Sequence, residues 1–158
     1  MKEELPKHFL YSAALFVSRT PHVIYTVLGS CVAVCLWDDQ NKIGGMNHYM
    51  LPFWNGEGLA SPKYGSIAIP KLIEKMENSG ARRSNIKAKV FGGGEVIETK
   101  GNFFNIGKRN IEVGMQLLEE YKIPIVSSSV GGVYGRKILF NTESGQIKQK
   151  YIPKNSAK

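Results

Sequence analysis

The apolar run from Cys31 to Trp37 constrains the fold of this chain more than any other segment. The run reads Cys-Val-Ala-Val-Cys-Leu-Trp, so both faces of a strand built from it would be apolar. Such a strand belongs in the middle of a layered protein, because each of its faces needs another layer to cover it. Gly29-Ser30 before the run and the polar cluster from Asp38 to Asn41 after it mark its ends.

Strand and helix patterns are interspersed along the rest of the chain. Apolar residues at helical spacing predict helices over 66–79 and 105–121. β-Branched and aromatic residues predict further strands, at 22–28, 42–51, 86–91, 123–130, 137–141 and 146–152. The apolar stretch 9–17 has no definite form. The order favours an α/β or α+β layered sandwich, with a mixed β-sheet core and two or three helices.

The composition limits the class of protein. The chain has 158 residues without a repeat or linker, so we expect one domain over 1–158 with a flexible basic tail at 153–158. It lacks an apolar run of about 20 residues and a signal-peptide layout at its start, so we expect a cytoplasmic protein without membrane insertion. The cysteines and histidines lack zinc-site spacing, so no zinc site is expected.

The formal net charge of +8 favours acidic partners, although a solvated basic surface explains it equally well. A nucleic-acid-binding module is a third function that we consider for this basic chain. The chain has no nucleic-acid recognition motif and no aromatic residues interleaved with a basic patch, so we do not expect nucleic acid as a partner.

Cys31 and His48 are the candidate catalytic pair. A turn centred between Asp39 and Gln40 would place them directly opposite each other on antiparallel strands, within reach of a sulfur–imidazole contact. A cysteine nucleophile needs a neighbouring base, because the thiolate is the reactive form and a free thiol is mostly protonated at neutral pH. Taken singly, a free cysteine is more often a small buried core residue, and a single histidine is more often structural.

A third group often orients a catalytic histidine. If Gly29-Ser30 forms a tight turn, Thr26 would lie on the face that carries Cys31, although the residues alone favour an ordinary strand threonine. The same turn would place the backbone N–H groups of Gly29 and Ser30 beside the sulfur as a candidate oxyanion hole. We interpret the second cysteine, Cys35, as part of the core.

Two runs together, from Leu28 to Val34 and from Gly44 to Pro52, resemble the CheD family of chemoreceptor glutamine deamidases. The resemblance covers residues 10–152 and continues through four further blocks, at 63–64, 91–94, 105–110 and 131–132 with 135–137. It implies a Cys-His-Thr triad in a sandwich similar to that of bacterial toxin deamidases. Cys31 and His48 match the motif directly. In some members the threonine position corresponds to Tyr25, whereas the face argument favours Thr26.

The resemblance also implies the reaction and its partners. The Cys31 thiolate would attack the carboxamide of a receptor glutamine, His48 would protonate the departing ammonia, and water would hydrolyse the thioester, without a metal or cofactor. Methylesterase activity would use the same chemistry. The implied substrate is the cytoplasmic domain of methyl-accepting chemoreceptors, which would recruit the protein to receptor arrays, and some members bind the phosphatase CheC. The alternative is a non-catalytic chemotaxis regulator that acts by binding these proteins.

Overall fold

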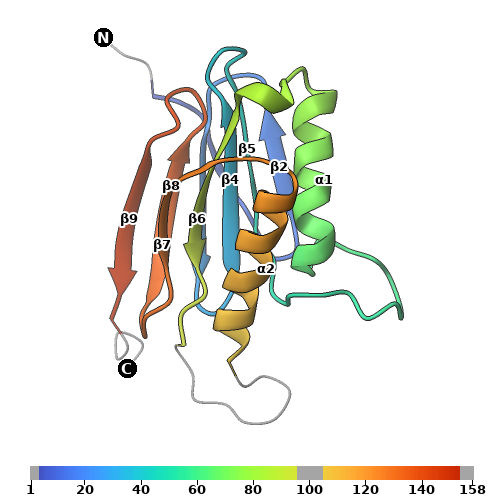
Figure 1. Cartoon of the computed structure of the whole chain (residues 1–158). Helices are drawn as coiled ribbons and strands as arrows, with labels where there is room; N and C mark the ends of the chain where they lie inside the picture. Colours follow the sequence, from blue (N-terminus) through green and yellow to red (C-terminus); the bar gives the residue numbers. More distant parts are fainter. Residues whose placement is uncertain (1–3, 96–104, 154–158) are drawn as a thin grey trace.

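The computed structural model describes residues 4–95 and 105–153, which form two β-sheets and two α-helices (Figure 1). The elements in chain order are β1 (Lys7–Phe9), β2 (Leu15–Ser18), β3 (Val23–Leu28), β4 (Val32–Asp38), β5 (Ile43–Asn47), α1 (Gly65–Asn78), a 3-10 turn (Arg83–Asn85), β6 (Ile86–Gly92), α2 (Ile106–Glu120), β7 (Ile125–Val130), β8 (Gly135–Asn141) and β9 (Ile147–Ile152).

Both sheets are mixed. The five-stranded sheet has the order β2-β5-β4-β6-β7, and only its β6–β7 pair is parallel. The four-stranded sheet has the order β1-β3-β8-β9, and only its β1–β3 pair is parallel. The predicted α+β sandwich of mixed sheets with two helices is therefore confirmed.

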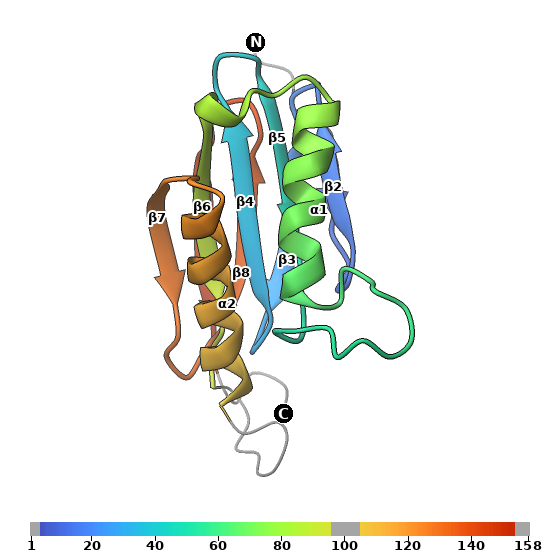
Figure 2. The ribbon, with the colours of Figure 1, turned by 45° about the vertical axis from the view of Figure 1, so that its right-hand side comes forward.

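Strand β4 lies between two cores, which explains its uninterrupted apolar sequence. All of its residues are buried. Val32, Val34 and Leu36 face the helical layer, where α1 packs over β2, β4 and β5 and α2 packs over β4 and β6 (Figure 2). Ala33 and Cys35 face the four-stranded sheet and pack in the core between the sheets. The interpretation of Cys35 as a core residue therefore agrees with the packing.

The predicted helices and strands are present with bounds shifted by a few residues. The stretch 9–17, which had no definite pattern, contributes to two edge strands, β1 and β2, that belong to different sheets. Of the basic tail, residues 154–158 lie outside the described residues, as does the segment 96–104.

Two expectations about local pairing are wrong. Gly29-Ser30 does not close a hairpin, because β3 and β4 belong to different sheets and the chain crosses between the layers there. The turn after β4 is also longer than expected. The Asp38 carboxylate accepts hydrogen bonds from the N–H groups of Gln40 and Asn41, at 3.0 Å each, and Asp38 itself pairs with Ile43.

The longer turn moves the register of β4 and β5 by two residues. Cys35 pairs with Met46 and Val32 with Tyr49, so the position across from His48 is that of Ala33, not Cys31. Because side chains alternate with a period of two, this shift keeps Cys31 on the face that carries His48, as its diagonal neighbour.

Candidate active site

The predicted catalytic residues come from both sheets, and Thr26 of one sheet contacts His48 of the other between them. Cys31 directly precedes β4, and His48 directly follows β5, so both lie at one end of the five-stranded sheet. Thr26 comes from β3 of the other sheet. On β3, Ile24, Thr26 and Leu28 are buried, whereas the residues between them are more exposed.

Tyr25 therefore lies on the opposite face of β3 from Thr26. Its ring contacts the ring of Phe9, with centroids 5.2 Å apart, and the Lys137 ammonium, 5.5 Å from the ring centroid. These contacts hold Tyr25 on the outer surface of the four-stranded sheet. The structure therefore brings Thr26, rather than Tyr25, to the imidazole.

The hydrogen bonds of Thr26 determine which nitrogen of His48 carries the proton. The Thr26 hydroxyl donates its hydrogen to the Leu10 carbonyl, at 2.7 Å, and lies 2.8 Å from His48 Nδ1. A hydroxyl has one hydrogen, so Thr26 Oγ1 must accept from Nδ1–H. The other ring nitrogen, Nε2, is then unprotonated in the neutral ring and can act as a base.

Burial keeps both the imidazole and the thiol uncharged. His48 is only 5% exposed, and burial lowers its pKa to about 4, although the Leu10 carbonyl partly opposes this. Burial also raises the pKa of the half-buried Cys31 thiol, an effect that its own backbone N–H partly offsets. At neutral pH the pair is therefore a thiol and a neutral imidazole, so the thiol must lose its proton as it attacks.

The loop 29–31 is bound through its carbonyl groups. The Gly29 carbonyl accepts from Gly94 N–H at 3.0 Å, and the Cys31 carbonyl accepts from Gly93 N–H at 2.8 Å. Within the described part of the chain, the N–H groups of Ser30 and Cys31 donate no backbone hydrogen bond. The oxyanion donors predicted from the sequence are the N–H groups of Gly29 and Ser30, so only that of Ser30 belongs to both pairs, and the Cys31 N–H already acts on its own sulfur.

Two contributors to this site have no role in the sequence-based prediction. The Leu10 carbonyl anchors Thr26, and the Asn110 amide donates hydrogen bonds to the carbonyls of Ser30 and Met50, at 3.0 Å each. No side-chain pattern identifies a backbone carbonyl such as that of Leu10. Asn110, in contrast, is a buried polar residue on the apolar face of α2, and that mismatch could have drawn attention to it.

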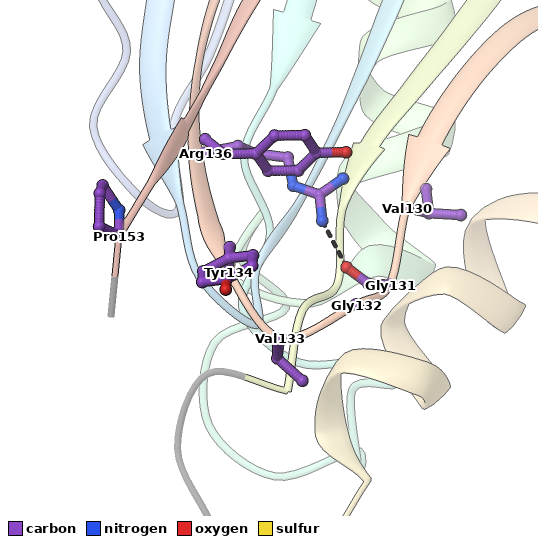
Figure 3. Close-up of a pocket in the computed structure, with 8 residues that line it drawn as sticks. Val130, Gly131, Gly132, Val133, Tyr134, Arg136 and Pro153 are labelled. Atoms are coloured by element: carbon purple, nitrogen blue, oxygen red, sulfur yellow. Dashed lines mark hydrogen bonds between the residues drawn. The ribbon is translucent and has the colours of Figure 1, made fainter. Parts of the chain in front are cut away.

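A pocket of about 580 Å³ opens at the same end of the sandwich (Figure 3). Its walls come from Val130–Tyr134 and from Tyr151 and Pro153, and the Arg136 guanidinium lies beside it and donates to the Gly131 carbonyl. Gly131 N–H donates to the carbonyl of Gly92 at 2.9 Å. The segment 92–94 therefore connects the pocket to the loop that carries Cys31.

Two further observations bear on the kind of site. In residues 4–95 and 105–153, no cluster of three or more His, Cys, Asp or Glu side chains could hold a metal ion. Within the same ranges, neither helix has the length and apolar character that crossing a membrane requires.

Comparison with known proteins identifies the class to which this fold and site belong. The model of the CheD family, described as CheD chemotactic sensory transduction, matches residues 50–151. The chain therefore belongs to the CheD family, and the resemblance seen in the sequence is confirmed.

Individual relatives match nearly the whole chain. A Trichlorobacter lovleyi protein named "Probable chemoreceptor glutamine deamidase CheD" is 52% identical over 141 residues, covering 89% of this chain and 88% of the relative. A Sulfurimonas denitrificans protein of the same name is 50% identical over 152 residues, covering 96% and 97%. A solved Neisseria meningitidis protein aligns with 81% of this chain and 63% of its own, at a TM-score of 0.47 and 11% identity.

Proposed function

We propose that this protein deamidates glutamine side chains of methyl-accepting chemoreceptors to glutamate, with Cys31 as the nucleophile. The hydrogen bond from His48 Nδ1 to Thr26 carries the proposal, because it leaves Nε2 as a base on the face that holds the thiol. The names of the relatives, which extend over almost the same length, support glutamine deamidation as the reaction.

The reaction proceeds in two steps. In the first, Nε2 of His48 takes the Cys31 proton as the sulfur attacks the glutamine carboxamide, and the backbone donors of loop 29–31 stabilise the oxyanion. The C–N bond then breaks, and the His48 imidazolium gives its proton to the departing ammonia. In the second, His48 deprotonates a water molecule that attacks the thioester, which releases glutamate and restores the thiol.

Thr26 acts by holding the imidazole in the reactive tautomer. Because its hydrogen is committed to the Leu10 carbonyl, it can only accept from Nδ1–H, and it stabilises the imidazolium that forms during the reaction. The same acyl-enzyme chemistry would hydrolyse receptor methyl esters, with methanol as the leaving group in place of ammonia.

Two features support a large, acidic substrate. The net charge of +8 would speed the association of the enzyme with an acidic receptor surface. The pocket beside loop 92–94 is lined by exposed side chains, Val133, Tyr134 and Tyr151, that could contact the polypeptide around the target glutamine. Recruitment to receptor arrays and binding of CheC are parts of the same proposal.

The experiment compares the two cysteines in one assay. A receptor cytoplasmic fragment is incubated with the wild type, Cys31→Ala or Cys35→Ala, and each converted glutamine is detected by mass spectrometry as an increase of about 1 Da. We expect Cys31→Ala to abolish conversion. Cys35→Ala is the matched control, because Cys35 is fully buried between the sheets, and it should retain activity.

Conversion by Cys31→Ala at the wild-type rate would overturn the assignment of the nucleophile. Receptor binding by the wild type without any conversion would favour the non-catalytic regulator. Urea unfolding of each variant shows that a loss of conversion does not come from a loss of the fold.

A further inference from the structure

Asn110 is a polar residue in an apolar environment. It lies on the face of α2 that also buries Ile106, Val113, Gly114 and Leu118, and it is fully buried. Its Nδ2 group uses both hydrogens, donating to the carbonyls of Ser30 and Met50 at 3.0 Å each. Its own backbone carbonyl accepts from the Tyr49 hydroxyl at 2.6 Å.

The two acceptors of the amide flank the catalytic pair. Ser30 directly precedes Cys31, and Met50 is two residues beyond His48. The pair Val32–Tyr49 is a backbone-bonded bridge between these segments, with N···O distances of 3.1 and 3.0 Å. Carbonyl groups cannot bond to each other, so the two amide hydrogens of Asn110 supply the link between Ser30 and Met50.

This arrangement has an energetic cost. The Oδ1 atom of Asn110 is buried and has no hydrogen-bond partner among the described residues. An unpaired buried acceptor is destabilising, and an apolar side chain of similar size would remove it, but would also leave the carbonyls of Ser30 and Met50 without the amide donors. The two N–H donors of the amide therefore have a role besides filling space in the core, which is to bind the carbonyls of Ser30 and Met50.

We propose that Asn110 is a positioning residue, whose amide fixes the distance between the segment that carries Cys31 and the segment that carries His48. This inference rests on the proposed function of those two residues. Proton transfer from the thiol to Nε2 requires hydrogen-bond geometry, and a displacement of about 1 Å can cost about a hundredfold in rate. Through Asn110, helix α2 of the helical layer thereby helps to hold the catalytic pair in position.

The test uses Asn110→Asp and Asn110→Leu, with Leu118→Ala as the control. The aspartate keeps the shape of the side chain but loses the two N–H donors, and the leucine also removes the unpaired acceptor. Leu118 is a fully buried core residue of the same helix, and no part of it contacts loop 29–31 by a hydrogen bond in the described structure. Its truncation lowers stability without removing the link.

Two measurements are made on each variant at a temperature where urea unfolding shows it to be folded. We expect kcat for the receptor fragment to fall about tenfold or more in both Asn110 variants, with KM changed less than about twofold. We also expect alkylation of Cys31 by iodoacetamide, measured in a Cys35→Ala background, to require a higher pH, because the thiol loses its nearby base. Leu118→Ala should change neither property.

Wild-type kcat and an unshifted alkylation profile in Asn110→Leu would overturn the proposal. So would an equal loss of kcat in Leu118→Ala, since that result would assign the effect to stability. The alkylation profile does not depend on glutamine conversion. If the wild type fails to convert glutamine, the proposed function fails, whereas the link between Asn110 and the thiol is still tested.

Discussion

The burial of His48 makes the stability of this protein depend on pH in a predictable direction. The ordinary pKa of the imidazole is 6.5, and burial lowers it to about 4 in the folded protein. As the pH falls below 6.5, the imidazole of the unfolded chain takes up a proton, whereas that of the folded protein stays neutral until about pH 4. The unfolded state therefore binds more protons in this interval, and the free energy of unfolding falls as the pH falls.

The size of the effect follows from the two pKa values. Each unit of pKa difference corresponds to about 1.4 kcal/mol, and the loss accumulates from about pH 6.5 down to about pH 4. For this single group the free energy of unfolding should fall by about 2 kcal/mol between about pH 7.5 and pH 5. The loss should reach about 3 kcal/mol near pH 4, and above about pH 7.5 the contribution should be constant.

Urea unfolding of the wild type and of His48→Gln at several pH values isolates this contribution. Glutamine does not titrate in this range, and its carboxamide can still donate a hydrogen to Thr26 Oγ1. All other titrating groups are common to both proteins, so their effects cancel in the difference. We expect the wild type to lose about 2 kcal/mol more than the variant between about pH 7.5 and pH 5. Parallel profiles, within about 0.5 kcal/mol, would refute the reasoning.

Three further predictions follow from the geometry of the site. Thr26→Val leaves His48 Nδ1–H and the Leu10 carbonyl without their hydrogen-bond partner, so it should lower the free energy of unfolding by about 1–3 kcal/mol and remove most deamidation. Thr26→Ser keeps the hydroxyl and should preserve both stability and activity in the same unfolding and conversion assays. Gly107→Ala would place a Cβ 2.5 Å from the Gly93 carbonyl, so it should lower the free energy of unfolding by about 1–3 kcal/mol, while alanine at an exposed position of α2 should not. Tyr134→Ala should raise KM for the receptor fragment about three- to tenfold and leave kcat unchanged, because Tyr134 lines the pocket and does not act on the thiol. An unchanged KM would exclude the pocket from substrate binding.

Much of the fold could be predicted because the signals are local. The two helices follow from apolar spacing, and the central position of β4 follows from a run that only two covering layers can bury. The short edge strands β1 and β2 could not be predicted, since their stretch has no clear periodicity and neighbouring strands complete them.

The prediction of the candidate site shows a similar division. The expected register of β4 and β5 is wrong by two residues, yet Cys31 and His48 still share a face, because an even shift preserves the alternation of side chains. The sequence argument for Thr26 rests on a hairpin that the structure does not contain. The structure nevertheless brings this threonine to His48, from across the sandwich, because the alternation of β3 points Thr26 inward and Tyr25 outward.

The sequence by itself thus determined that both faces of β4 are buried, and that the candidate nucleophile and base lie on the same side of their sheet. The tertiary structure decided which groups form hydrogen bonds with each other in the site. Only the packing of the second sheet brings Thr26 and the Leu10 carbonyl to the imidazole, and only the packing of α2 brings Asn110 between Ser30 and Met50. The physical reason is that side-chain alternation is a property of one strand, whereas a hydrogen bond between layers depends on which elements pack together.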